Sequence, residues 1–280
     1  MIKTLAFGVT SLVLLLTSAP ALAQDYEYHP ALSDNFTATI GWMRSNNSFK
    51  VEAETLGDDE GTYVDFQDSL GVDGHSTLWN AQLRYKFGRE RKWSVFGQYF
   101  SNKADGEAIL TEDVEWDGDI FREGSLVGSG VKMQIYRLFF GRSLFKNNRH
   151  DFGIGAGIHN LDVSAYIEGN VAVNDDDFEY TYDEVGFSQI LPNIGAWYNF
   201  SPAKRWLLHA RVDWISADIG DYDGTMWNTT VGVNFQAWRH VGFDLYWQYF
   251  NINGGAEKDD WRGSLDMTYS GPVVAMTFAW

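Results

Sequence analysis

The sequence lacks cysteine and has little basic charge. Without cysteine the chain forms no disulfide, uses no thiolate chemistry and cannot be processed as a lipoprotein. Its 21 Lys and Arg stand against 38 Asp and Glu, which gives a formal net charge of −17 at pH 7. Because binding to a phosphate backbone needs a basic face, nucleic acid is excluded as a partner.

Long hydrophobic runs are missing beyond the N-terminus. The mean hydropathy is −0.28, and only the first residues contain a long apolar stretch, so a helical membrane protein is excluded. Aromatic residues make up 16% of the chain, and 28 positions are glycine. This composition leaves two classes open, a soluble exported β-protein and a membrane-spanning β-barrel.

The N-terminus predicts export. Lys3 is followed by an apolar stretch at 5–16, and an Ala-x-Ala pattern then ends at Ala23. The stretch is too short for a spanning helix, which needs about 20 residues. We therefore expect residues 1–23 to be a cleaved signal peptide and residues 24–280 to form one β-barrel domain.

Several segments alternate apolar and polar residues with a period of two, as strands with one apolar face do. The clearest are 79–87, 206–214, 227–235 and 241–249. In 206–214, for example, Trp206 and Trp214 share the apolar face, whereas His209, Arg211 and Asp213 share the other. Each of these segments predicts a β-strand.

The position of aromatic residues favours a membrane barrel over a soluble sandwich. Aromatic pairs eight residues apart bracket the apolar faces: Trp79 and Phe87, Trp206 and Trp214, Trp227 and Phe235. Eight tilted residues cover about 20 Å along a membrane normal, which fits side chains at the two membrane interfaces. Polar and charged residues on the opposite face then line the lumen. The expected polar network there is Arg84, Arg137, His209, Arg211, Asp213 and Asp244, with Lys86 and Asp266 as further members.

Connections alternate between short and long. Short turns are expected at 88–92, 146–149, 201–204 and 238–240, and long loops near 47–75, 104–128, 169–185, 218–223 and 253–262. Between them lie ten expected strands, at 34–46, 76–88, 92–103, 129–145, 150–166, 187–200, 204–217, 224–237, 240–252 and 263–280. The predicted fold is an all-β, transmembrane, antiparallel up-and-down barrel with short periplasmic turns and long extracellular loops. Eight or twelve strands stay open as alternatives.

Charge sorts with the connections, because Lys and Arg gather around the short turns and Asp and Glu in the long loops. Irregularities are expected at three places: a bulge near Ile135 and Tyr136, where the apolar phase changes, and irregular pairing at Pro192 and Pro272. Segments 48–55 and 107–116 look extended, so strands are expected to continue beyond the membrane.

The C-terminus alternates apolar residues and ends on an aromatic one. Val274, Met276, Phe278 and Trp280 resemble the C-terminal segment that the barrel assembly machinery reads in outer-membrane barrels. The whole chain after residue 23 resembles the OmpA-like and OmpW-like superfamily of small bacterial barrels. This resemblance implies an outer-membrane location, with the assembly machinery and periplasmic chaperones as partners, but it implies no activity.

Three functions remain open. The first is a barrel plugged by its own lumen charges, which are expected to pair because unpaired charges in a narrow barrel are costly. The second is a narrow pore, which the acidic residues at its mouth would make selective for cations. Acidic positions such as Asp113, Asp117 and 175–177 offer oxygen ligands without matching a calcium motif.

An outer-membrane hydrolase is the third reading. In size the chain is similar to the omptin proteases, and segments 117–119 and 73–75 contain carboxylates and a histidine, but in the opposite chain order to that family. We therefore expect a monomeric, non-enzymatic barrel without cofactor or metal. Its surroundings would be outer-membrane lipid and lipopolysaccharide, and its role structural or interactive.

Overall fold

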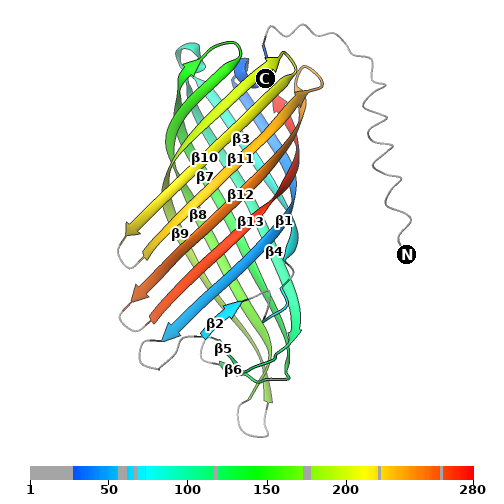
Figure 1. The fold of residues 1–280 in the computed structure, drawn as a ribbon, viewed down its shortest axis with the longest axis vertical. Helices are drawn as coiled ribbons and strands as arrows, with labels where there is room; N and C mark the ends of the chain where they lie inside the picture. The colour runs from blue at the N-terminus through cyan, green and yellow to red at the C-terminus, as the bar shows by residue number, and fades with distance from the viewer. Residues whose placement is uncertain are drawn as a thin grey trace, which may run out of the picture.

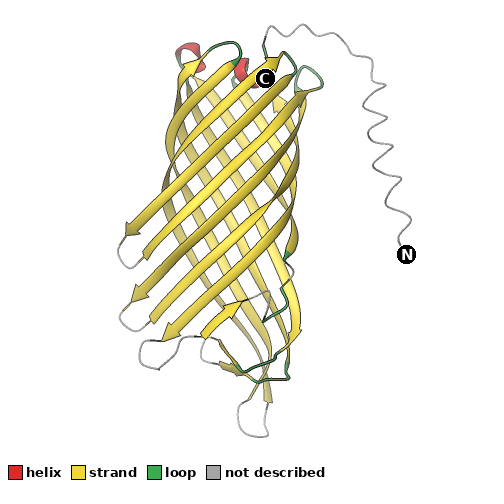
Figure 2. Ribbon diagram, viewed as in Figure 1, coloured by secondary structure: helices red, strands yellow, loops and turns green. Residues whose placement is uncertain are grey.

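The computed structural model describes residues 28–55, 62–65, 69–72, 74–116, 119–172, 178–219, 222–258 and 261–280. The expected signal peptide lies outside them. Ten long strands form one closed antiparallel barrel (Figures 1 and 2). They are β1 (Phe36–Thr55), β3 (His75–Phe87), β4 (Trp93–Ile109), β7 (Leu126–Lys146), β8 (His150–Ala172), β9 (Phe178–Ala203), β10 (Trp206–Ile219), β11 (Tyr222–Gln236), β12 (Val241–Lys258) and β13 (Trp261–Ala279). The predicted fold class and strand count are confirmed.

Each long strand pairs with its neighbours in sequence, and β13 pairs with β1 to close the barrel. The expected C-terminal alternation faces outward at this seam. Phe278 pairs with Ala38, Met276 with Ile40, and Val274 with Trp42. Trp280 exchanges backbone hydrogen bonds with Phe36 at 2.9 and 3.1 Å, and their rings stack with centroids 5.8 Å apart. The last residue therefore helps to fasten the two ends of the sheet.

Smaller elements lie at the two ends of the barrel. Helix α2 (Pro30–Ser33) and the 3₁₀ turn η1 (Arg89–Arg91) lie at the end that carries the short turns, which we call the short-turn end. Strands β2 (Thr62–Asp65), β5 (Val114–Trp116) and β6 (Asp119–Phe121) lie at the opposite, long-loop end (Figure 1). No helix in the described ranges is long and apolar enough to cross a membrane.

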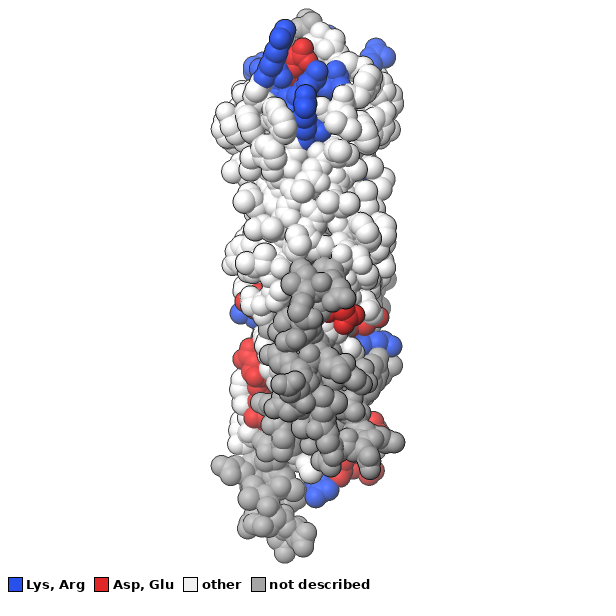
Figure 3. Space-filling model, turned by 90° about the vertical axis from the view of Figure 1, so that its left-hand side faces the viewer, with Lys and Arg blue, Asp and Glu red and all other residues white. Residues whose placement is uncertain are grey.

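Charged side chains are concentrated at the two ends of the barrel, and an uncharged band separates them on the face shown in Figure 3. Lys and Arg gather at the short-turn end of this face, and acidic side chains are seen toward the long-loop end. Many of the acidic loop positions, including Asp117 and 175–177, fall outside the described residues. The expected sorting of charge is seen among the residues that are described.

Exposed apolar side chains form an outer belt around the barrel. Leu83, Leu138, Ile154 and Leu208 are each about half exposed, at 46–54%. Aromatic rings lie at both borders of this belt on β10 and β11. Trp206 pairs with Phe235 near the short-turn end, and Trp214 pairs with Trp227 toward the long-loop end.

Strands β3 and β4 repeat this arrangement of aromatic rings. Phe87 pairs with Trp93 at the short-turn end, and Trp79, which is 46% exposed, contacts Tyr99 farther along the strand with ring centroids 5.4 Å apart. The six interface aromatics named from the sequence therefore lie at two levels. Such a spacing is typical of interface girdles.

The polarity of the lumen changes along the barrel axis. In the long-loop half it holds a packed apolar cluster, which we call the lumen core. Its buried members include Met43, Phe49, Phe100, Val131, Met133, Ile135, Leu161, Val163, Ile167, Phe250, Met267 and Tyr269. Residues from the connecting segments, such as Leu70 and Phe121, cover its end. The expected polar network therefore lies in the short-turn half, and the long-loop half is mainly apolar apart from a small hydrogen-bonded cluster of Ser45, Asn47 and Asn102.

The lumen core also explains why the bulge expected near Ile135 and Tyr136 is wrong. The register of β7 with β4 and β8 runs unbroken through both residues, and it shifts only between Ser143 and Phe145. Ile135 points inward, into the core, whereas Tyr136 points outward and is 51% exposed. No phase change is needed, because Val131, Met133 and Ile135 face the lumen core, whereas Leu138 and Phe140 face outward into the apolar belt.

The irregular pairing expected at Pro192 and Pro272 is present. At each proline the pairing with one neighbouring strand stops, but the register does not shift. Pro272 pairs with Trp247 of β12, but the ladder to β1 is interrupted between Met43 and Asn46. Near Pro192 the ladder between β9 and β10 ends at Ile194 and Trp214 in the described residues, while β9 continues along β8 to Phe178. A proline has no amide to donate, so it suits the edge of a ladder.

Candidate functional site in the barrel lumen

The candidate site is the polar half of the lumen, at the short-turn end. The alternation of β10 turns His209, Arg211 and Asp213 to the same inner face, and β12 adds Asp244 by the same rule. Arg84 on β3 and Arg137 on β7 face them across the lumen. The structure thus brings together all six residues of the network predicted from the sequence.

Asp213 is the centre of this network. Its carboxylate accepts a hydrogen bond from Arg211 Nε at 3.0 Å and another from Arg211 Nη2 at 3.2 Å. Arg137 forms an ion pair with the same carboxylate, and Asn193 Nδ2 donates to it at 3.3 Å. The side chains of Arg137 and Asp213 are 2% and 1% exposed. A buried carboxylate with two cationic partners avoids the large cost of an unpaired charge.

Three arginines surround one aromatic ring. The guanidinium carbons of Arg84, Arg137 and Arg211 lie 5.5, 5.1 and 4.6 Å from the centroid of Phe96. Arg211 also lies 4.2 Å from the centroid of Phe139. These contacts stabilise each cation by its attraction to the ring face. They also hold three positive charges close together in a space of low dielectric.

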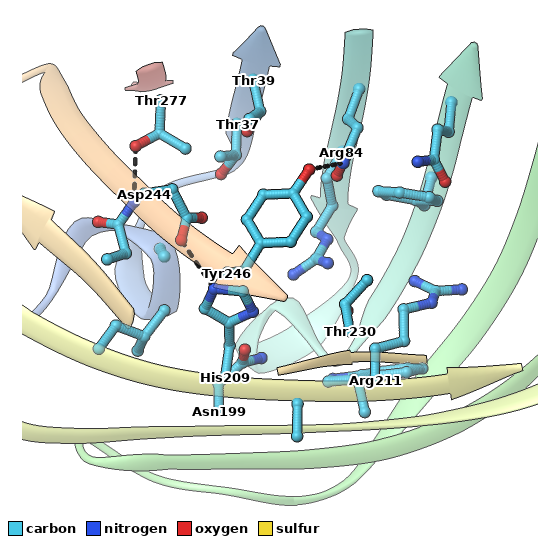
Figure 4. A pocket seen from close by; sticks show the side chains of 18 of the residues that line it. Thr37, Thr39, Arg84, Asn199, His209, Arg211, Thr230, Asp244, Tyr246 and Thr277 are labelled. Atoms are coloured by element: carbon cyan, nitrogen blue, oxygen red, sulfur yellow. Dashed lines mark hydrogen bonds and ion pairs between the residues drawn. The ribbon is translucent and has the colours of Figure 1, made fainter. Parts of the chain in front are cut away.

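A second pair lies on the other side of the lumen. His209 Nε2 and Asp244 Oδ1 are 2.8 Å apart, and the ring of Tyr246 packs edge-on against His209 (Figure 4). Tyr246 Oη accepts hydrogen bonds from Asn80 and Gln82 at 3.2 and 3.3 Å. These contacts fix the positions of His209 and Tyr246 beside the arginine cluster.

A cavity of about 110 Å³ separates the two groups. Arg84, Arg211, His209, Asp244 and Tyr246 project into it, as Figure 4 shows. Its other lining residues include Thr37, Thr39, Gln82, Gln98, Asn199, Thr230 and Thr277. A space of this size accommodates several water molecules or one small solute.

Sequence reasoning missed Asp151, which lies beside this network. It is 1% exposed, and its carboxylate accepts a hydrogen bond from Ser143 Oγ at 2.6 Å and one from Trp197 Nε1 at 3.4 Å. Lys86, which was expected in the lumen, lies 3.8 Å from it. Asp151 follows a short turn, where an acidic residue is ordinarily exposed. Its burial could have been predicted only from the alternation of β8, which turns residue 151 toward the lumen.

The N-terminal segment was missed as well. His29 and Leu32 are buried, Ala31 lines the cavity, and Lys86 donates a hydrogen bond to the carbonyl of Ala31. Burial and the nearby charge of Lys86 lower the pKa of His29 from 6.5 to about 4, so His29 is neutral at physiological pH. This N-terminal segment, residues 28–35, contains α2 and covers the short-turn mouth of the lumen.

One expectation about the lumen network is wrong, and another, about the hydrolase, concerns residues that the structure does not describe. Asp266 does not join the lumen network: it points outward, is exposed, and accepts a hydrogen bond from Asn253. The phase of β13 explains this, because Met267 and Tyr269 are its inward residues. Asp117 and Asp73, which suggested a hydrolase, are not among the described residues.

The glycines of β8 leave space for inward aromatic rings. A Cβ atom on Gly153 would lie 2.2 Å from Trp197 Cζ2, and one on Gly155 would lie 2.6 Å from Phe139 Cε1. The rings of Trp197 and Phe139 therefore fill the space that a side chain at Gly153 or Gly155 would need. This packing closes the lumen on the side of the arginine cluster.

Comparison with known proteins connects this architecture to a known fold. The outer membrane protease OmpT from Escherichia coli superposes with a TM-score of 0.58 at 10% sequence identity, over 92% of this chain and 99% of that one. The chain has the outer-membrane β-barrel fold. At this identity the likeness shows the fold alone.

Other outer-membrane barrels superpose less well. The transport unit of the autotransporter AIDA-I from Escherichia coli has a TM-score of 0.41 at 10% identity, over 97% of this chain and 98% of that one. The Pseudomonas putida toluene transporter TodX has a TM-score of 0.37 at 8% identity, over 94% and 93%. No protein-family model and no curated protein matches the sequence of this barrel.

Proposed function

We propose that this chain is a non-conducting, non-enzymatic barrel of the bacterial outer membrane that presents a structured extension at the cell surface. The apolar belt would lie in the hydrocarbon, with the short-turn end in the periplasm and the long-loop end outside. Its role would be structural or interactive. The acidic outer end would meet lipopolysaccharide and the divalent cations bound to it.

The observation that carries this proposal is the lumen core. Phe250 and Tyr269 stack with ring centroids 4.7 Å apart, and Phe100 packs edge-on against Tyr269 at 5.2 Å. All three side chains are at most 3% exposed. Ions do not cross a close-packed apolar layer, because an unpaired charge in such a layer costs many kcal/mol. The core therefore supports a barrel closed to ions.

The non-enzymatic part of the proposal rests on where the polar groups lie. His209 and Asp244 lie in the short-turn half, and the lumen core separates them from the long-loop end. A peptide or lipid at the cell surface would not reach them. The likeness to a protease extends to the fold, and one fold supports many activities.

A pore is the second candidate, because the cavity gives the short-turn half a polar space. Three arginines but only two aspartates line it. The excess of positive charge in the cavity does not favour the passage of cations, although the acidic residues at the outer mouth would favour it. A pore would therefore need an open lumen core and would not have the cation selectivity expected from the sequence.

Planar-bilayer recording of the refolded protein tests the proposal. We expect no conductance steps from the natural chain in 1 M KCl. A triple variant, Phe100→Ala with Phe250→Ala and Tyr269→Ala, removes the rings of the lumen core and is expected to conduct. Ile154→Ala, a change in the outer belt, is the matched control and should stay silent.

Steady conductance of the natural chain would overturn the proposal in favour of the pore. For the enzymatic alternative, the purified barrel is incubated with peptides and with lipopolysaccharide, and the products are analysed by mass spectrometry. We expect no cleavage and no change in lipid A. Cleavage that is abolished by His209→Ala would contradict the non-enzymatic proposal.

A further inference from the structure

The cavity in the short-turn half has more cations than carboxylates to pair with them. Of the charged residues that line it, Asp213 is bound by Arg137 and Arg211, and Asp244 is bound by His209. Lys86 and Asp151 form a separate pair next to the cavity. After this pairing one cation, Arg84, remains.

Arg84 has no close anionic partner. Within the described part of the chain, its guanidinium group forms no ion pair within 4.0 Å and no side-chain hydrogen bond. It lies over the ring of Phe96, and Asp151 and Asp244 attract it only from a longer distance. The other two arginines lie against the same ring. The three guanidinium groups repel one another, and the nearby carboxylate Asp213 contacts only Arg137 and Arg211. An anion placed beside Arg84 would relieve that repulsion.

We propose that this cavity binds a small oxyanion, a carboxylate or a phosphate, with Arg84 as its main contact. The planar fork of a guanidinium donates two parallel hydrogen bonds to such a group. Arg211 lies on the same side of the cavity (Figure 4). The hydroxyl groups of Thr37, Thr230 and Thr277 supply further donors around the lining.

The volume of the cavity limits the ligand to a few heavy atoms. The space is about 110 Å³, and a cavity of about 150 Å³ holds benzene in another protein. Orthophosphate and acetate are therefore suitable in size, whereas a nucleotide or a lipid is too large. Because the lumen core closes the other side, the ligand would enter from the short-turn end by passing the N-terminal segment, whose His29 and Ala31 line the cavity.

The test uses the full chain, refolded in detergent, and follows its thermal unfolding by tryptophan fluorescence. Sodium phosphate, sodium acetate and sodium chloride are added in separate series at constant ionic strength. A bound ligand raises Tm in proportion to the logarithm of its concentration, by about 5 °C at 100 times Kd. We expect this rise with phosphate, acetate or both, and the series that gives it identifies the oxyanion.

Two variants show where the anion binds. Arg84→Met keeps the length of the side chain and removes its charge, so the rise in Tm should disappear. Without ligand this variant should unfold at the same or a higher temperature than the natural chain. Arg142→Met removes an exposed arginine that packs on Trp93 outside the lumen and should keep the full rise.

Three results would overturn the proposal. They are the absence of a rise with both oxyanions up to 50 mM, an equal rise with chloride, and an unchanged rise in Arg84→Met. The last of these would assign the effect to the outer surface. None of them depends on whether the barrel conducts, so this test and the conductance test fail independently.

Discussion

At the scale of single residues, the lumen shows how a barrel accommodates charge that water does not fully solvate. Asp213 has two arginine partners and Asp151 has Lys86, so each buried carboxylate is neutralised locally. A buried ion pair adds little net stability, but the loss of one partner leaves the other uncompensated. The effect of a substitution here therefore depends on which charge it leaves behind.

Arg137→Met is expected to destabilise the barrel by about 2–4 kcal/mol, because Asp213 then keeps only Arg211 and loses an ion pair inside the lumen. The double variant Arg137→Met with Asp213→Asn removes both charges and should recover part of that loss. The measurement is denaturant unfolding in detergent micelles. Arg142→Met, on the outer surface, should change stability by less than about 0.5 kcal/mol. Equal stability of Arg137→Met and Arg142→Met would show that the pair is unimportant.

At the scale of elements, strand β8 shows how the polarity of the two faces of a strand changes with depth. On β8, His159 points inward among polar groups in the belt region, whereas Leu161 and Val163 point into the lumen core. Over the same stretch the outward residues change from Ile158 to Asp162. The strand therefore has a lipid-facing pattern in one half and the pattern of a soluble protein in the other.

The glycines of β8 give a prediction at this scale. Gly153→Ala places a Cβ atom against Trp197 and should cost about 1–3 kcal/mol through overpacking. Gly97→Ala is the matched strand-glycine control, since its nearest neighbour is the carbonyl oxygen of Arg137 at 3.9 Å. Adding Trp197→Phe to Gly153→Ala should restore part of the lost stability in the same unfolding assay. A Gly153→Ala variant as stable as Gly97→Ala would contradict the packing argument.

The alternation of residues made the strands predictable, and the aromatic spacing made the outer belt predictable, because both depend only on local sequence. The inward position of Arg84 or Asp244 follows from the same rule. The sequence did not reveal the lumen core, since Val131 and Met133 have the same pattern whether they face lipid or a core. Asp151 and the N-terminal segment were missed because their burial depends on contacts far apart in the chain.

At the scale of the whole molecule, the absence of cysteine allows the orientation to be measured directly. Single variants Thr111→Cys, between β4 and β5, and Asn148→Cys, between β7 and β8, place one exposed thiol at each end of the barrel. In intact cells a membrane-impermeant maleimide should label Thr111→Cys and leave Asn148→Cys unlabelled. Both should react after the cells are lysed. Labelling of Asn148→Cys alone in intact cells would reverse the orientation.

The end of the ladder between β9 and β10 also limits how deeply the barrel can be immersed. Beyond Ile194 and Trp214 the β10-facing edge of β9 has no strand paired with it in the described residues. Backbone amides and carbonyls without partners are not tolerated in hydrocarbon, so this edge must lie where water reaches it. On the side of the long loops, the lipid boundary therefore lies at the level of Trp214 and Trp227 and does not extend past Pro192 toward Phe178.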